Sequence, residues 1–139
     1  MTRTPSVGAE SIANPAAPSP RARSIWVRSP RDPAVVGLRR VLIAEQPRHP
    51  SLAATWRSAT VDATVEELTA HFTALQRRGL LRTFPAASVA RQFLWMLIGD
   101  ALDVGLLDPS ARLPPARSTA ENAVKMLLAA YQISAEERA

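Results

Sequence analysis

The sequence predicts an all-α fold, a bundle of about five helices, and three observations support this class. Apolar residues recur at helical spacing through the middle of the chain, at Val61, Val65, Leu68, Phe72 and Leu75. Proline, aspartate and glycine stand where helices are expected to begin and end. No segment shows the alternation of apolar and polar residues that is typical of a half-buried strand.

The composition limits the chain to one small domain without disulfide bonds. The 139 residues include no cysteine, which excludes disulfides and thiolate metal sites. The longest uninterrupted apolar run, 93–98, is far shorter than the roughly 20 residues that cross a bilayer. No apolar signal-peptide segment follows the start. We therefore expect a cytoplasmic protein that does not bind membranes.

The net charge of +5 is concentrated at the N-terminus. Residues 1–31 contain five arginines and one glutamate, whereas residues 32–139 contain twelve basic and eleven acidic side chains. The first segment also holds five prolines and no apolar periodicity, so it cannot bury enough surface to offset the entropy of ordering. We expect a disordered Pro/Arg/Ser-rich tail over residues 1–31 and a helical domain over residues 32–139.

The first helix is predicted to begin at Asp32-Pro33, because aspartate caps a helix and proline suits its first position. It should end near Gln46, before Pro47. A helical repeat places one set of side chains on a common face: Val35, Leu38, Val41, Leu42 and Glu45.

Two helical segments follow. Pro50 opens a short one, and a long amphipathic helix extends from Thr60 to Arg78. Gly79 suits the position just after its end. The sequence leaves open whether the two segments form one bent helix.

The next helix, from Pro85 to about Leu107, is apolar around its full circumference over residues 93–98. Such a helix must be covered on all sides, and a second subunit is the simplest cover in a small domain. The residues 108–117 are expected to form a loop. Ser118 and Glu121 form a capping-box pattern at the start of the last helix, which is predicted over 118–131.

Four places in the chain form a recognisable layout: Ala44-Glu45 at a helix end, the segment Arg48-His49-Pro50-Ser51-Leu52-Ala53, the helix end Arg78-Gly79-Leu80-Leu81-Arg82, and the opening Pro85-Ala86-Ala87-Ser88-Val89-Ala90-Arg91-Gln92-Phe93. Over roughly residues 34–131, this layout resembles the C-terminal half of tetracycline-repressor (TetR/AcrR) family transcription regulators. Phe84 departs from the family pattern, which usually has an acidic cap there. Residues 1–33 also lack the periodicity of the family's DNA-binding helix-turn-helix.

The resemblance implies a module that binds an effector and dimerises, without direct sequence-specific DNA binding by this chain. The partner would be a second copy or a full-length relative, and the effector a small apolar molecule. The candidates for an effector pocket are Trp56, Phe72, Trp95 and Met96, although such residues at helical spacing are also typical of an ordinary core. The candidates for the dimer interface are Trp95, Ile98, Leu102, Val124, Leu127, Leu128 and Tyr131.

Two alternatives stay open. The chain could be a truncated or mis-started product whose helical domain folds but has no independent activity. It could also be a small nucleic-acid-binding protein that acts through its basic tail, the arginines of residues 21–31 together with Trp26. No phosphate loop, catalytic triad or metal-ligand spacing is present, so we expect no enzyme activity, no cofactor and no metal.

Overall fold

The computed structural model describes Pro30 and residues 32–134, and within these residues it confirms the all-α fold. The elements are α2 (Pro33–Glu45), α3 (Pro50–Arg57), a π-helical turn η1 (Ser58–Asp62), α4 (Ala63–Arg77), α5 (Ala86–Leu107) and α6 (Ala116–Tyr131). The tail predicted over residues 1–31 lies outside the described residues except for Pro30. None of the described helices combines the length and the apolar character that crossing a membrane requires.

The start of α2 confirms the prediction, because the Asp32 Oδ1 atom accepts a hydrogen bond from the Ala34 N–H at 2.9 Å. The predicted apolar face was partly wrong. Val36 and Leu42 are buried, whereas Leu38 and Val41 are about half exposed. The reason is tertiary: Val36 lies against Gly105 of α5, where the absence of a side chain lets α2 approach closely.

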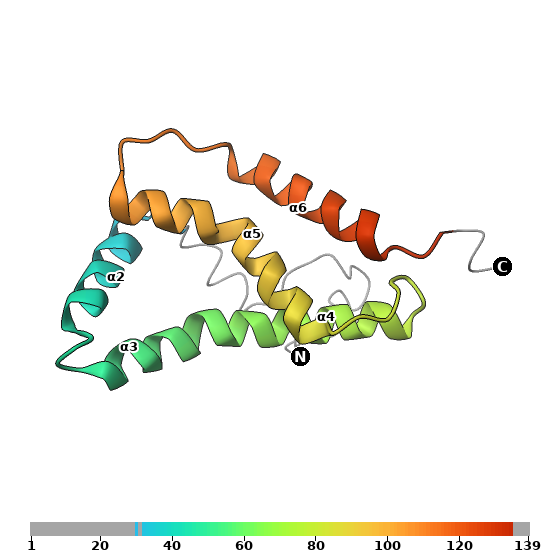
Figure 1. The fold of residues 1–139 in the computed structure, drawn as a ribbon, viewed down its shortest axis with the longest axis horizontal. Coiled ribbons are helices and arrows are strands. Elements are labelled where there is room, and N and C mark those ends of the chain that lie inside the picture. The colour runs from blue at the N-terminus through green and yellow to red at the C-terminus, as the bar shows by residue number, and fades with distance from the viewer. Residues whose placement is uncertain (1–29, 31, 135–139) are drawn as a thin grey trace, which may run out of the picture.

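The segments α3, η1 and α4 form one continuous helix, which answers the question that the sequence left open (Figure 1). Within η1 the helix widens to a π turn. The hydroxyl of Thr60 donates to the Trp56 carbonyl and that of Thr64 to the Thr60 carbonyl, both at 2.8 Å. Such bonds from Thr to the preceding turn often accompany a local bend.

Gly79 ends α4 as predicted. Its φ angle of +66° is in the left-handed region that favours glycine. The Leu80 N–H donates to the Leu75 carbonyl at 3.0 Å, and the Gly79 N–H donates to the Gln76 carbonyl at 2.9 Å. This pair of bonds is the Schellman motif, and it satisfies carbonyl groups that the helix end would otherwise leave without partners.

Helix α5 lies at the centre of the bundle and contacts α2, α4 and α6 (Figure 1). The predicted capping box of α6 was wrong. Pro115 occupies the N-cap, so the helix begins at Ala116 and Ser118 lies inside its first turn. The carboxylate of Glu121 instead accepts a hydrogen bond from the Arg117 side chain at 3.0 Å. The adjacent Pro114 and Pro115 place the chain in an extended conformation just before Ala116.

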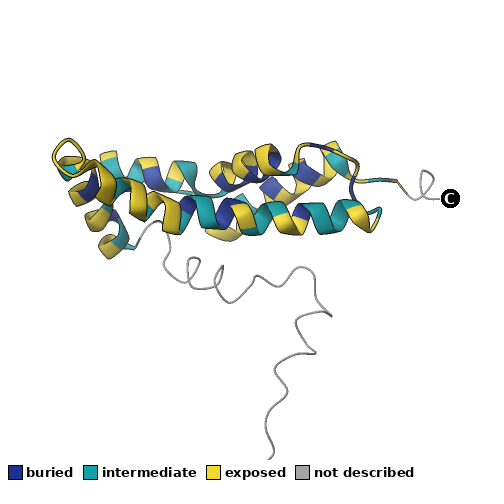
Figure 2. Ribbon diagram, turned by 90° about the horizontal axis from the view of Figure 1, so that it is seen from below, coloured by how far each residue is buried: buried dark blue, intermediate teal, exposed yellow. Residues whose placement is uncertain are grey.

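The hydrophobic core lies between α4, α5 and α6, and its buried residues line the inner sides of these helices (Figure 2). Phe84 belongs to this core and does not cap the helix: the N-cap of α5 is Pro85, which makes no side-chain cap hydrogen bond. The ring of Phe72 lies edge-on to Phe84 and to Phe93, with centroids 6.0 and 5.7 Å apart. The ring of Tyr131 closes the cluster, 4.3 Å from Phe84.

A backbone bridge that the sequence did not indicate joins the α4–α5 connection to the end of α6. The Arg82 N–H donates to the Tyr131 carbonyl at 2.8 Å, and the Ile133 N–H donates to the Leu80 carbonyl at 3.4 Å. The side chain of Gln76 donates to the carbonyls of Arg82 and Phe84 at 3.1 and 3.0 Å. These bonds hold the connection against the core.

We expect Gly79→Ala to lower the free energy of unfolding by about 1 kcal/mol, because an L-residue is strained at this φ angle. Gly37→Ala is the matched control. Gly37 lies in the interior of α2 with open space where a Cβ would stand, so alanine should leave stability unchanged or raise it by up to about 1 kcal/mol. Urea unfolding at one fixed protein concentration measures both, and equal effects would contradict the helix-end assignment.

Candidate functional site

The first candidate site is a cavity of about 200 Å³ between α2, α3, η1 and α5, which we call the tryptophan cavity. Its walls carry both predicted tryptophans, together with a mixed apolar and polar set: Arg39, Leu42, Ile43, Gln46, Ala53, Trp56, Arg57, Val61 and Trp95. The apolar walls and the few polar groups are the composition expected of a small-molecule site.

Local structure explains why these side chains meet. Trp56 lies on the last turn of α3 and Val61 lies within η1, so the π turn itself contributes to the cavity wall. Leu42 and Val61 are buried and form the apolar base, whereas Trp95 is 39% exposed. The cavity therefore extends from the bundle interior to the outer side of α5.

The charged groups of the cavity differ in their partners. Arg57 makes two hydrogen bonds to the Asp62 carboxylate, at 3.0 and 3.1 Å, and Arg91 of α5 approaches the same carboxylate at 3.3 Å. The guanidinium carbon of Arg39 lies 5.2 Å from the centre of the Trp56 ring. Burial lowers the pKa of Arg39 from its ordinary value, because desolvation disfavours the charged form.

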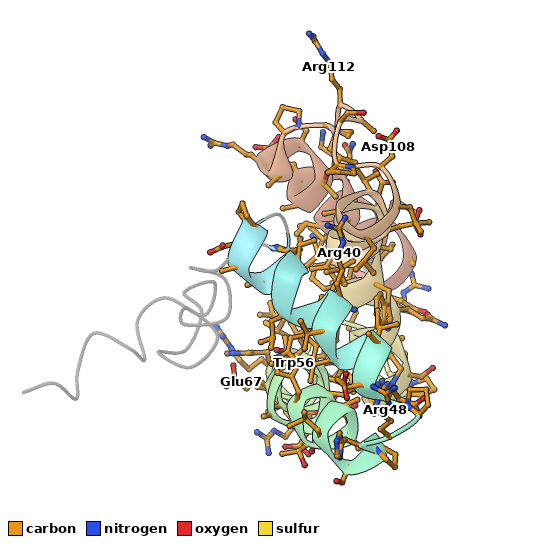
Figure 3. The ribbon with its side chains drawn as sticks, turned by 90° about the vertical axis from the view of Figure 1, so that its left-hand side faces the viewer. Arg40, Arg48, Trp56, Glu67, Asp108 and Arg112 are labelled. Carbon is orange, nitrogen blue, oxygen red and sulfur yellow. The ribbon has the colours of Figure 1, made fainter. Side chains whose placement is uncertain are left out.

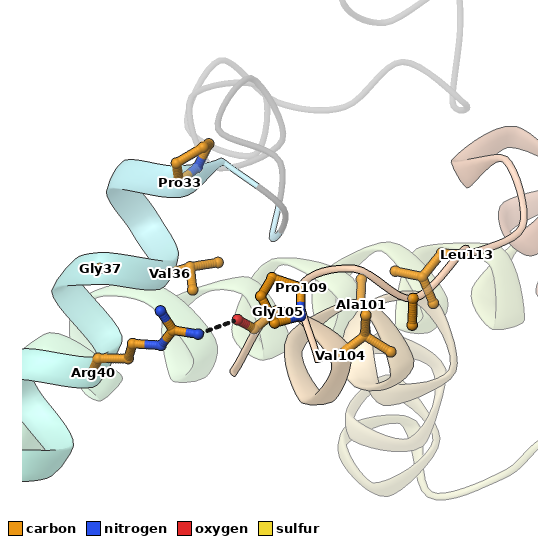
Figure 4. A pocket seen from close by; sticks show the side chains of 10 residues that line it. Pro33, Val36, Gly37, Arg40, Ala101, Val104, Gly105, Pro109 and Leu113 are labelled. Atoms are coloured by element: carbon orange, nitrogen blue, oxygen red, sulfur yellow. Dashed lines mark hydrogen bonds between the residues drawn. The ribbon is translucent and has the colours of Figure 1, made fainter. Parts of the chain in front are cut away.

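A second cavity, of about 340 Å³, lies where the start of α2 meets the end of α5 (Figure 4). Arg40 stands at its edge and donates from Nη2 to the carbonyls of Gly105 and Leu106, each at 3.1 Å. A cation at the carboxyl end of a helix is favourable, and here it also ties α2 to α5. Figure 3 shows Arg40 between these helices, whereas Arg112 extends away from the bundle.

The structure brings two of the four predicted pocket residues together. Trp56 and Trp95 share the tryptophan cavity. Phe72 is buried in the core instead, and Met96 is partly exposed on α5 and lines neither of these two cavities. Arg39 and Gln46 were not predicted from the sequence. The available signal was the pair Arg39-Arg40 within an otherwise apolar stretch of α2.

The predicted interface residues divide into two groups. Leu102 and Leu127 are buried inside this chain, and Ile98 and Tyr131 are half-buried against the core. Trp95, Val124 and Leu128 remain about 40% exposed. Among the predicted interface residues, this second group presents the most exposed apolar surface on α5 and α6.

Comparison with known proteins places this architecture in the class of helical regulator domains. Residues 26–133 match the family model described as the AefR-like transcriptional repressor, C-terminal domain. A solved structure from Mesorhizobium loti, described as a TetR-family transcriptional regulator, superposes with a TM-score of 0.69 and 23% sequence identity. The superposition covers 86% of this chain and 62% of that one. The search among curated proteins found no match.

Since the family model covers more than half of the chain, the protein belongs to the TetR family of transcriptional regulators, with an AefR-like C-terminal domain. This confirms the resemblance noted in the sequence and the all-α fold that it implied. The chain spans about three fifths of the length of the solved relative.

We expect Phe72→Ala to lower the free energy of unfolding by about 3–5 kcal/mol, because it removes a ring from between two others in the core. Met96→Ala is the control at a partly exposed position and should change stability by less than about 1 kcal/mol. Thermal and urea unfolding measure both. A small effect at Phe72 would reopen its assignment to a ligand site.

Proposed function

We propose that this domain is the ligand-binding and dimerisation module of a TetR-type transcriptional regulator, acting in the cytoplasm and without enzyme activity. The observation that carries the proposal is the position of Trp95. Its side chain lines the tryptophan cavity and is also 39% exposed to solvent. One residue therefore belongs both to the proposed ligand site and to the proposed subunit contact.

The proposed ligand is a small molecule with an apolar aromatic body. Two indole rings supply wide, flat contact area, and the aliphatic side chains of Leu42 and Val61 form the base. A cavity of about 200 Å³ matches a ligand of one or two rings rather than a large polycyclic one.

The proposed dimer is a four-helix bundle in which α5 and α6 of each subunit pack against their symmetry mates. The exposed apolar groups Trp95, Val124 and Leu128 favour this arrangement, because exposed apolar surface on a small domain can mark a contact surface. Leu102 and Leu127 would support the interface from inside. A full-length relative with the same face would pair in the same way.

Coupling between the two sites follows from their shared helix. A ligand shifts a dimer between two arrangements only if it binds one of them more tightly. Rotation of the Trp95 side chain would change the cavity wall and the exposed face of α5 together. No direct sequence-specific DNA binding is proposed for this chain; in a pair with a full-length relative, the DNA-reading helices would belong to that relative.

Ligand binding is tested with the neutral aromatic probe 2-naphthamide in isothermal titration calorimetry. We expect saturable binding to the wild type and about ten-fold weaker binding to Trp56→Ala, because the variant removes one wall of the cavity. Leu107→Ala, which alters an exposed apolar residue elsewhere on α5, should bind as the wild type does. No heat signal with any variant would favour a folded domain without ligand-binding activity.

Dimerisation is tested with Leu128→Asp, which places a charge in the proposed interface. We expect this variant to sediment as a folded monomer where the wild type sediments as a dimer, because a carboxylate buried without a partner is strongly unfavourable. Met126→Asp is the matched control: Met126 is exposed on the same helix, about 160° away around the axis. A dimeric Leu128→Asp variant, or a monomeric Met126→Asp variant, would contradict the proposed face.

A further inference from the structure

We propose that the tryptophan cavity selects an aromatic monocarboxylate, and that Arg39 is the residue that binds the carboxylate. The inference deepens the proposed function and rests on the ligand site described there. It concerns the charge of the ligand, which the apolar walls alone leave unspecified.

Arg39 is a cation without an anionic partner. Its Nε atom is buried and has no hydrogen-bond partner, and no ion pair joins Arg39 to any residue that the structure describes. Its contact with the Trp56 ring compensates only part of the lost hydration. Buried polar groups are normally hydrogen-bonded, so the unpaired Nε–H of this half-buried side chain at a cavity wall points to an absent acceptor.

The other arginines near the cavity are already engaged. Arg57 and Arg91 share the Asp62 carboxylate, which leaves that group neutralised and unable to serve Arg39. Arg40, the next residue along α2, donates to two carbonyls at the end of α5. Among the residues that the structure describes, Arg39 is therefore the cation of the cavity wall that has no ion pair and can bind a ligand anion.

The geometry favours a carboxylate on a flat ring. A guanidinium presents a planar fork of N–H donors that matches the two oxygens of a carboxylate. A single unpaired cation balances one negative charge, and the walls around it are aromatic and aliphatic. The Gln46 amide, also at the wall, is an additional donor for the same oxygens.

The test compares 2-naphthoate with 2-naphthamide, which have the same rings and nearly the same shape but differ in charge. Calorimetry at neutral pH should show the wild type binding 2-naphthoate at least ten-fold more tightly than 2-naphthamide, because hydrogen bonds to a charged group are strong. In Arg39→Gln this preference should fall to two-fold or less, while 2-naphthamide binds as in the wild type. Arg48→Gln is the control: its exposed side chain lies outside the cavity wall, so the variant should keep the preference.

Each contrary result has a distinct meaning. Equal affinity of the wild type for both probes, or an undiminished preference in Arg39→Gln, would overturn the assignment of Arg39 and leave the aromatic site intact. Loss of the preference in Arg48→Gln alone would also overturn it. Absence of binding by both probes would overturn the site itself and the proposed function with it. Circular dichroism establishes that each variant is folded before its affinity is compared.

Discussion

The packing of α5 against three other helices is the interaction on which the rest of this structure depends. Helix α5 contacts α4 and α6 on the core side and α2 at its carboxyl end, so it is the element that joins the cavities to the core. Ala90 is completely buried where α5 meets the core, and its small side chain permits a close approach between helices. At the other end Gly105 plays the same part beneath Val36.

This arrangement separates two regions with different physical demands. The aromatic cluster of Phe72, Phe84 and Phe93 lies between α4, α5 and α6, where close packing supplies stability. Both cavities lie on the α2 side, where polar contacts such as the Arg40 bonds to α5 hold the helices together. Side chains around the cavities can therefore vary between relatives without disturbing the core, which is the condition for one fold to serve different ligands.

Local signals predicted most of the helix limits, because they are set by residues adjacent in the sequence. Asp32 and Gly79 act through their own backbone neighbours, and both predictions were confirmed. The face of α2 was misjudged because it depends on where Gly105 of α5 lies, which helical periodicity does not contain. Of the candidate pocket residues, Trp56 and Trp95 converge and Phe72 does not, and spacing alone treats all three alike. Arg39 was missed because its significance lies in the partners it lacks.

The π turn at residues 58–62 sets the phase between the two halves of the long helix. A π turn adds one residue to a turn, which offsets side chains before it by about 100° relative to those after it. The direction of the Trp56 side chain is thus set independently of the α4 side chains that pack into the aromatic core, although all of them lie on one continuous helix. Removing one residue within η1 would restore a regular helix and turn the Trp56 indole away from α2. The shape of the cavity wall therefore depends on this irregularity of the helix as well as on the residues that line the cavity.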